Sequence, residues 1–290
     1  MTNSFDFQYQ CLLRKIIQHG EWCSTRGLDY KYVFNHSLSV DLRSDFPALT
    51  LRNVYPHGAI DEAKNDLSGS GFRLANLKSK GLAKAWEPFG NKFGYIPNTY
   101  GRSMRRWPAS VQKWSDKLLG KVSSVEVDQF TNAIEKLIKD PTSRSVVIQI
   151  HNPTSIEGQP TCQTSFVLSS NGDRLDGVVF CRSNDASKGL LGDFIRYAVF
   201  IKIIAYFSKL EPGTLAFNCV NAHIYKEDME DAKKLAWSAY QPSARPSFSL
   251  LTVNPKTYDF EYDLDYDYDR SFRLSNKGIE VGDLSSYNLD

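Results

Sequence analysis

The sequence lacks the features that mark several specialised classes of protein. Its 5 cysteines are an odd number and form no C-x-x-C pair, so neither a disulfide framework nor a zinc site is indicated. This cysteine pattern is typical of a reducing compartment, and we expect a cytoplasmic protein. The chain also has no apolar run of about 18 residues and no basic, apolar leader, so we expect neither a membrane span nor a signal peptide.

A large excess of charge of one sign is also missing. With 35 basic and 33 acidic residues, the net charge is only +2. Proteins that bind nucleic acid usually carry a basic patch or stripe, and none is visible here, so a nucleic-acid-binding module is disfavoured. Any anion-binding site must therefore be local, of the size that a small phosphate pocket requires.

The composition that remains is that of an ordinary globular domain. Hydrophobic residues make up 41% of the chain and charged residues 23%, with no internal repeat and no clean linker. We therefore expect one domain over residues 1–290. Residues 58–100, rich in Gly, Ser, Asn and Lys, form its least regular segment, and residues 271–290 form a C-terminal tail.

Hydrophobic periodicity predicts helices and strands in alternation, which indicates an α/β fold. Helices are expected over residues 5–19, 123–139, 193–208 and 226–240, and strands over residues 32–42, 146–150, 164–170, 175–182 and 213–220. Ser123 and Glu126 form a capping-box pattern at the start of their helix. The helix 193–208 is apolar on nearly every side and should be a buried central helix, whereas the helix 226–240 is polar and should be exposed.

Residues able to carry out chemistry gather in three short motifs. Cys162 follows a proline turn, Arg182 to Asp185 end the next apolar run, and Asp193 opens the central helix. A Cys taken alone is usually a small buried hydrophobe. Here it belongs to a set that offers a thiol nucleophile, an anion-binding Arg and Ser, and two carboxylates. Such a set suits chemistry on a nucleotide base.

The pair Asn171-Gly172 is a strong turn signal between two apolar runs and predicts a hairpin of residues 164–170 and 175–182. Conventional pairing in this hairpin places Arg182 beside Cys162. A neighbouring cation lowers the pKa of a thiol and so raises its thiolate fraction. The same guanidinium can hold a phosphate through a forked pair of hydrogen bonds.

The order and spacing of these motifs resemble the thymidylate synthase family. The matching segments span about residues 10–270 and read DFPALT at 45–50, YGR at 100–102 with Trp107-Pro108 after it, DPTSR at 140–144, PTC at 160–162, RSND at 182–185, GLLGD at 189–193 and NAHIY at 221–225. The resemblance implies a single α/β domain with a mixed sheet, flanking helices and a buried central helix. It also implies a homodimer with its sheets back to back, a pyrimidine nucleoside monophosphate as substrate, 5,10-methylenetetrahydrofolate as co-substrate, and no metal.

The resemblance assigns roles to five residues that would hold the nucleotide. Cys162 would be the nucleophile that adds to C6 of the pyrimidine, and Arg182 and Ser183 would bind the phosphate. His223 and Tyr225 would bond the sugar 3′-hydroxyl, although a lone His is more often a core residue. Their paired match favours the nucleotide-binding role.

Two further arginines are assigned to phosphate. Arg144 matches the first of two arginines that, in the family, cross the dimer interface to the partner's nucleotide, while Ser145 replaces the second. Arg26 is the candidate for a phosphate-binding Arg in the loop 24–27, and a solvated loop Arg is the alternative.

Three residues would serve the folate side of the reaction. Glu62 would organise water and proton transfer at the base, Trp86 would pack against folate, and Asp185 would bond the pterin and assist proton transfer. The alternatives are a surface Glu on a helix and a core Trp. The C-terminal residues 285–290 do not match the apolar peptide that closes the site in thymidylate synthases, so closure would fall to other residues.

Asp193 selects the branch of the family. Thymidylate synthases carry Asn at this position, which matches the uracil edge, whereas the cytidylate hydroxymethylases carry Asp. A carboxylate accepts hydrogen bonds from both the C4 amino group and a protonated N3 of cytosine. The predicted activity is therefore deoxycytidylate 5-hydroxymethyltransferase, with Ser183 favouring the deoxynucleotide.

Alternatives to this activity stay open at the level of sequence. They are CMP 5-hydroxymethylase, thymidylate synthase, deoxyuridylate hydroxymethylase, and a catalytically silent nucleotide-binding relative. Asp193 would be a simple N-cap in a purely structural interpretation, since Asp favours that place. Arg196 lies one turn further along the helix, and the sequence does not decide whether it holds Asp193 or faces a ligand.

Overall fold

A computed structural model of the chain describes residues 4–69, 72–76, 87, 90–96, 100–111, 123–153, 161–241 and 244–275. Its largest element is a seven-stranded sheet in the order β1-β2-β11-β9-β8-β7, with β10 paired to β11. The strands are β1 (Glu21–Thr25), β2 (Leu28–Asp41), β7 (Val146–Gln149), β8 (Gln163–Ser170), β9 (Arg174–Cys181), β10 (Asn184–Asp185) and β11 (Glu211–Tyr225). Strand β11 runs parallel to β9 and β10 and antiparallel to β2, so the sheet is mixed, as predicted.

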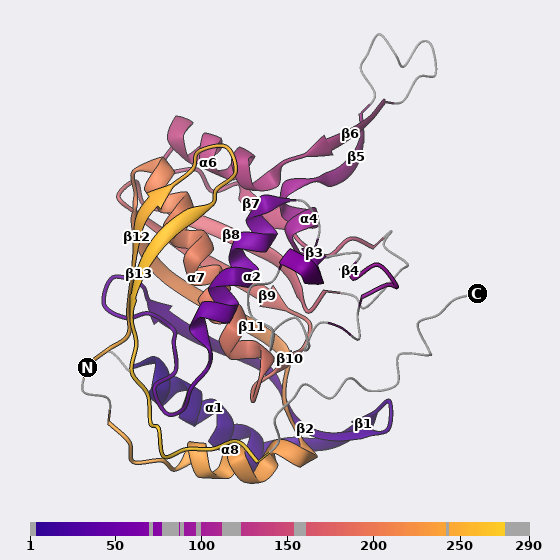
Figure 1. Cartoon of the computed structure of the whole chain (residues 1–290), viewed down its shortest axis with the longest axis vertical. Helices are drawn as coiled ribbons and strands as arrows, with labels where there is room; N and C mark the ends of the chain where they lie inside the picture. Colours follow the sequence, from indigo (N-terminus) through magenta and orange to yellow (C-terminus); the bar gives the residue numbers. More distant parts are fainter. Residues whose placement is uncertain are drawn as a thin grey trace.

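The helices pack around this sheet, whereas the hairpin of β5 (Trp107–Val111) and β6 (Ser123–Val127) projects away from the body of the molecule (Figure 1). The helices are α1 (Phe5–His19), α2 (Pro56–Ser68), α4 (Tyr100–Arg105), α6 (Gln129–Lys139), α7 (Gly189–Ser208) and α8 (Met229–Ala236), with short 3₁₀ turns η1 (Leu74–Asn76) and η3 (Lys226–Asp228). Among the described residues there are also three two-stranded sheets, formed by β3 (Phe72–Arg73) with β4 (Tyr95–Ile96), β5 with β6, and β12 (Ser247–Val253) with β13 (Phe260–Asp265). None of the helices that the structure describes is long and apolar enough to cross a membrane.

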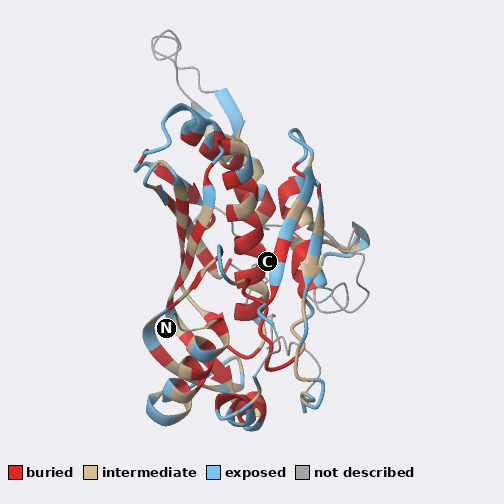
Figure 2. Cartoon of the chain, turned by 90° about the vertical axis from the view of Figure 1, so that its left-hand side faces the viewer, coloured by how far each residue is buried: buried red, intermediate tan, exposed pale blue. Residues whose placement is uncertain are grey.

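Helix α7 is the centre of the core, as its apolar sequence predicted. Phe194 stacks on Phe217 of β11 with ring centroids 4.1 Å apart, and it makes an edge contact with Phe5 of α1 at 4.9 Å between centroids. Phe200 contacts Phe130 of α6 at 6.0 Å. Buried residues, red in Figure 2, therefore concentrate on this helix and on the sheet face that points toward it. Burial on nearly every side, with Tyr206 near its end exposed, fits a helix that is apolar almost all round.

The opposite face of the sheet carries an apolar row that is only partly buried. Val147, Val167, Val178 and Ala216 are paired in register across β7, β8, β9 and β11. Side chains alternate along a strand, and Phe166, the neighbour of Val167, is fully buried toward the helices. The row therefore points away from the helices, and Val147 at its end keeps 50% of its surface exposed.

Several element boundaries differ from the sequence predictions. Strand β2 begins at Leu28 rather than residue 32, and β11 runs to Tyr225 rather than residue 220. Three further differences change what a segment does. The predicted helix 123–139 is wrong in its first part, because residues 123–127 form β6 and the helix starts later, with Asp128 as N-cap accepting from the Thr131 N–H at 3.0 Å. The valines at 125 and 127 favour a strand. In place of the predicted exposed helix 226–240, the chain forms the shorter elements η3 and α8. Helix α8 is partly buried against α1, where the Gln10 side chain donates to the Leu235 carbonyl at 3.0 Å.

The third difference concerns the start of the central helix. It begins at Gly189 rather than at Asp193, so Asp193 lies in the second turn and is not the N-cap. The capping interpretation of Asp193 is therefore wrong, and the carboxylate must be explained by the groups around it.

Candidate active site

Cys162 lies just before β8, beside the end of β9 and at the opposite end of the hairpin from its turn. Its carbonyl accepts a hydrogen bond from the Arg182 N–H at 2.9 Å, so the hairpin brings these residues together, as predicted. The Arg182 side chain donates through Nε to the Thr161 carbonyl at 3.0 Å. The Cys162 N–H in turn donates to the Tyr100 hydroxyl at 3.2 Å, which ties the segment to α4.

The charges around Cys162 act in opposite directions on its thiol. Burial raises the pKa of the Cys162 thiol, and the nearby Asp193 carboxylate raises it further. Three arginines, Arg182, Arg196 and Arg26, lower it, with Arg182 having the largest effect. The net direction is upward, so the thiol is protonated at rest and needs help to become a thiolate.

Asp193 accepts hydrogen bonds from three different elements. Its Oδ1 accepts a hydrogen bond from Nη2 of Arg196 at 2.6 Å, a contact that the spacing of the two residues on one helix allows. Its Oδ2 receives the Asn184 amide of β10 at 2.9 Å and the Gln163 amide of β8. Burial raises the pKa of Asp193, and the Arg196 guanidinium is the largest influence that lowers it.

Glu62 belongs to the same network from the other side. Helix α2 places its carboxylate 3.8 Å from Nη1 of Arg196 and places Asp66, one turn later, 3.5 Å from that nitrogen. The Arg196 guanidinium also lies 4.2 Å from the centre of the Tyr100 ring. Burial raises the pKa of Asp66 to about 7, partly opposed by Arg196 and reinforced by Glu62. The surface-helix alternative for Glu62 is therefore wrong, because its side chain is only 13% exposed.

The sugar-binding candidates gather at the end of β11. The Ser183 hydroxyl lies 3.4 Å from Nδ1 of His223, and the rings of His223 and Tyr225 are 5.1 Å apart. Asp185 pairs with His223 in the parallel β10–β11 register, and its Oδ1 accepts from the Ser187 N–H at 2.8 Å. Burial lowers the pKa of His223, so its imidazole is neutral near pH 7 and can both donate and accept a hydrogen bond.

Arg26 lies at the turn of the β1–β2 hairpin, with a positive φ of 50°. That hairpin carries Tyr30, whose ring contacts His223 at 5.3 Å. The charge of Arg26 lowers the pKa of both Cys162 and Tyr225, so the arginine lies within electrostatic reach of this site.

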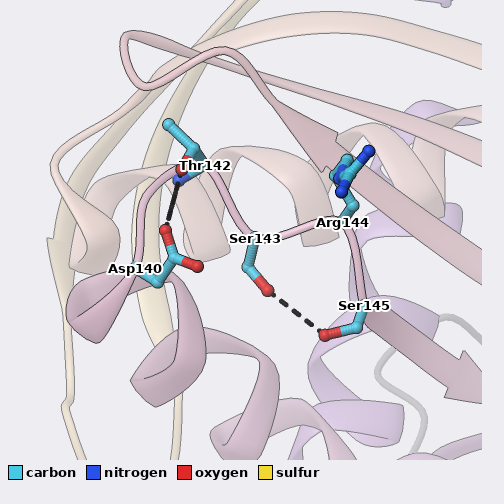
Figure 3. A pocket seen from close by; sticks show the side chains of 5 residues that line it. All are labelled: Asp140, Thr142, Ser143, Arg144 and Ser145. Atoms are coloured by element: carbon cyan, nitrogen blue, oxygen red, sulfur yellow. Dashed lines mark hydrogen bonds between the residues drawn. The ribbon is translucent and has the colours of Figure 1, made fainter.

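Arg144 is the predicted phosphate ligand that lies apart from the others. It is exposed in the turn between α6 and β7 and lines a shallow pocket with Asp140, Thr142, Ser143 and Ser145 (Figure 3). The register of β7 on β8 places this turn near Ser170, at the far end of β8 from Cys162. The eight residues of β8 separate the two by roughly 25 Å at about 3.3 Å per residue.

Trp86 lies outside the described residues, as do residues 285–290. Within the described ranges, no cluster of three or more His, Cys, Asp or Glu side chains could hold a metal ion. Sequence reasoning missed Asp66, Gln163, Asn184 and Tyr100 as members of the site. Asp66 could have been found, because it follows Glu62 by one helical turn and so shares its face.

A partly buried thiol among arginines, a carboxylate held by amide groups, and a neutral histidine beside a serine form a set that suits covalent chemistry on an anionic, hydrogen-bonding substrate. A sequence model of the family described as thymidylate synthase matches residues 7–273. The chain belongs to the thymidylate synthase family. It is therefore a folate-dependent enzyme that transfers a one-carbon unit to C5 of a pyrimidine nucleotide, and methylenetetrahydrofolate is the donor that the family uses.

Proposed function

We propose that this enzyme is a deoxycytidylate 5-hydroxymethyltransferase. The observation that carries the proposal is the Asp193 carboxylate, which is held in the second turn of α7 by Arg196, Asn184 and Gln163. A carboxylate offers about four lone-pair sites and three are in use, so Asp193 can still accept from the C4 amino group, while a bond from a protonated N3 would have to share an oxygen with one of the present donors. An acceptor suits the C4 amino donor of cytosine and is mismatched to the O4 acceptor of uracil.

The reaction begins at Cys162, which adds to C6 of the pyrimidine and makes C5 nucleophilic. Arg182 binds the phosphate and favours the thiolate, and Ser183 and His223 hold the nucleotide at the end of β11. Methylenetetrahydrofolate, when bound, supplies the one-carbon unit and would leave as tetrahydrofolate. Glu62 orders the water that takes the C5 proton. A second water adds to the resulting exocyclic methylene to give the hydroxymethyl group, and Cys162 leaves C6 as the thiolate. The partly exposed Asp185 suits a pterin, because its carboxylate can accept from ring N–H groups.

The substitution that tests the proposal is Asp193→Asn. It replaces an acceptor-only group by one acceptor and one donor, so the donor opposes the cytosine amino group and matches uracil O4. A missing partner in a buried polar site discriminates by roughly 10⁴-fold. We therefore expect loss of deoxycytidylate turnover and a partial gain with deoxyuridylate.

The measurement is kcat/KM for deoxycytidylate, CMP and deoxyuridylate with methylenetetrahydrofolate, with products identified by mass. Asp176→Asn is the matched control, because Asp176 pairs with Arg174 on β9 rather than with the site, and the nucleotide ratio should be unchanged. A wild-type enzyme that prefers deoxyuridylate, or a ratio that Asp193→Asn leaves unchanged, contradicts the proposal. A wild-type preference for CMP keeps the base assignment and corrects the sugar.

We also propose that the active enzyme is a homodimer joined through the apolar row of Val147, Val167, Val178 and Ala216. A contiguous apolar patch on a sheet face is typical of an interaction surface. The separation of roughly 25 Å between Arg144 and Cys162 supports an arginine that serves the partner's site, because it is too long for both to contact one nucleotide within a chain. A symmetric interface would give each subunit the partner's Arg144.

A further inference from the structure

Arg196 is the most deeply buried charge in the described part of the central helix, and it faces three carboxylates at once. Its side chain is 2% exposed, and it contacts Asp193 at 2.6 Å, Asp66 at 3.5 Å and Glu62 at 3.8 Å. A single carboxylate would suffice to neutralise the guanidinium. Burying two additional acids carries a desolvation cost, so a purely structural ion pair does not explain the arrangement.

The two ends of the guanidinium have different partners. Nη2 points toward the base-binding side, where it donates to Asp193 Oδ1 and lies 3.4 Å from Gln163 Oε1. Nη1 faces Asp66 and Glu62 on α2. Because Arg196 takes the oxygen of the Gln163 amide, the amide nitrogen is the end that turns to Asp193. One side chain thus orients both groups that line the base-recognition corner.

We propose that Arg196 is a positioning residue for base recognition, which keeps Asp193 ionised and turned toward the substrate while Asp66 anchors the guanidinium from α2. This inference rests on the proposed function, because it concerns how the cytosine reader is held. Base selectivity then belongs to a chain of three residues, Asp66, Arg196 and Asp193, that spans two helices. Asp193 without Arg196 would be one more buried acid in an acidic corner and would take up a proton.

Other charged and titratable groups lie within electrostatic reach of Asp193. Its carboxylate acts on Asp66 on α2, Tyr100 on α4, Cys162 before β8, Cys181 on β9 and Tyr197 on α7, and Glu62 on α2 faces it across the Arg196 guanidinium. In this group Arg196 is the cation in direct contact with the Asp193 carboxylate. Its removal should therefore move the titration of Asp193 upward more than removal of any other member.

The variant Arg196→Met tests the proposal. For deoxycytidylate we expect kcat/KM to fall by about ten- to hundredfold, the scale of a lost charge-assisted hydrogen bond. The acidic limb of the kcat/KM–pH profile should move to higher pH by about one to three units, the usual effect of an opposite charge on an aspartate. Arg196→Lys keeps the charge and should restore the acidic limb while recovering only part of the rate.

Arg105→Met is the matched control for loss of a buried arginine. Arg105 pairs with Asp128 at 2.9 Å, away from Asp193, so this variant should lose stability and keep the wild-type pH profile. The double variant Arg196→Met/Asp66→Asn guards against misfolding, because it removes an acid that the single change leaves unpaired. Thermal melts identify the folded variants.

The outcomes separate the two proposals. The role of Arg196 is overturned if a folded single or double variant keeps the wild-type acidic limb of the kcat/KM–pH profile and the wild-type ratio of kcat/KM between deoxycytidylate and deoxyuridylate. A wild-type enzyme that prefers deoxyuridylate instead overturns the proposed function, and this result requires no variant. A shifted limb in both Arg196→Met and Arg105→Met would assign the shift to general destabilisation and would also overturn the role of Arg196.

Discussion

At the scale of single residues, the reactivity of Cys162 depends on a balance between burial and cations. Burial and Asp193 raise the pKa of its thiol, whereas Arg182, Arg196 and Arg26 lower it. A substrate phosphate that binds Arg182 would partly neutralise the strongest of these cations. When Cys162 adds to the base, other groups must therefore replace the charge of Arg182 in stabilising the thiolate. The polar groups around the base are placed to do so.

Arg182→Ala should slow the alkylation of Cys162. Removing the strongest stabilising cation raises the pKa of the thiol further, so less thiolate is present at pH 7. We expect the rate with iodoacetamide to fall by about three- to tenfold, corresponding to up to about one pKa unit. In the wild type, the rate should rise about tenfold per pH unit below the thiol pKa.

Mass spectrometry of the peptide that contains Cys162 gives this rate separately from the other four cysteines. Arg174→Ala is the control, because Arg174 lies at the opposite end of β9 and pairs with Asp176. Equal alkylation rates in wild type and Arg182→Ala would show that Arg182 does not act on the thiol.

At the scale of elements, the contact between α2 and α7 carries buried charge where most helix contacts are apolar. Asp66 is 1% exposed, and its backbone lies against Gly101 of α4 so closely that an added Cβ there would come within 2.4 Å of the Asp66 carbonyl oxygen. The Gly101 N–H donates to Asp66 Oδ1 at 3.1 Å. Three helices thus meet at one carboxyl group, which makes its protonation a property of their packing.

Asp66→Asn should change how stability depends on pH. The pKa of Asp66 is raised from 3.8 to about 7 in the folded protein, so between these values the folded state holds a proton that the unfolded state has lost. The wild type therefore loses stability as pH rises from about 4 to 7, by up to about 1.4 kcal/mol per pH unit. The asparagine variant lacks this titration.

The free energy of unfolding, measured in urea at several pH values, checks this sign. The free energy of unfolding of the wild type, relative to that of Asp66→Asn, should fall as the pH rises to 7 and stay constant above pH 7. A constant difference across that range would mean that Asp66 does not bind a proton on folding in this window.

The hydrophobic pattern of a single segment was sufficient to predict the elements that such a pattern defines. The hairpin of β8 and β9 and the buried α7 are confirmed, and the Asn171-Gly172 turn fixed the approach of Arg182 to Cys162. The predicted start of helix α6 was wrong because residues 123–127 pair with β5, and a helical pattern in the sequence does not reveal this pairing.

The site was predictable to the same degree. The contact between Arg196 and Asp193 followed from their spacing on one helix. The second contact of Arg196, with Asp66, depends on how α2 crosses α7 and could not be read from either segment alone. The same is true of Gln163 and Asn184, which reach Asp193 only because β8 and β10 end beside it.

At the scale of the whole molecule, one face of the main sheet remains available for assembly. Val178 stands near the middle of the partly buried row, between Val167 and Ala216. A charge at this position would be desolvated in a face-to-face dimer without a partner, which is strongly unfavourable.

Val178→Glu should therefore convert the proposed homodimer to a monomer and lower activity with it. Sedimentation velocity at several protein concentrations measures the mass, and kcat measures the second effect. Tyr206→Glu is the control, because this aromatic residue is 54% exposed on α7, away from the outer face of the sheet. A wild type that sediments as a monomer, or a Val178→Glu variant that stays dimeric, contradicts the assigned interface.

The pairing of β2 with β11 also sets the order in which the protein can mature on the ribosome. Their eleven register pairs, from Thr214 with Asp41 to Tyr225 with Tyr30, join segments that lie about 180 residues apart. At about 5–20 residues per second, β2 emerges roughly 10–40 seconds before its partner strand is made. During translation the edge of β2 that faces β11 must wait unpaired, because β1 covers only part of the opposite edge. Nascent chains that end before residue 211 should therefore bind holding chaperones and release them only when β11 arrives.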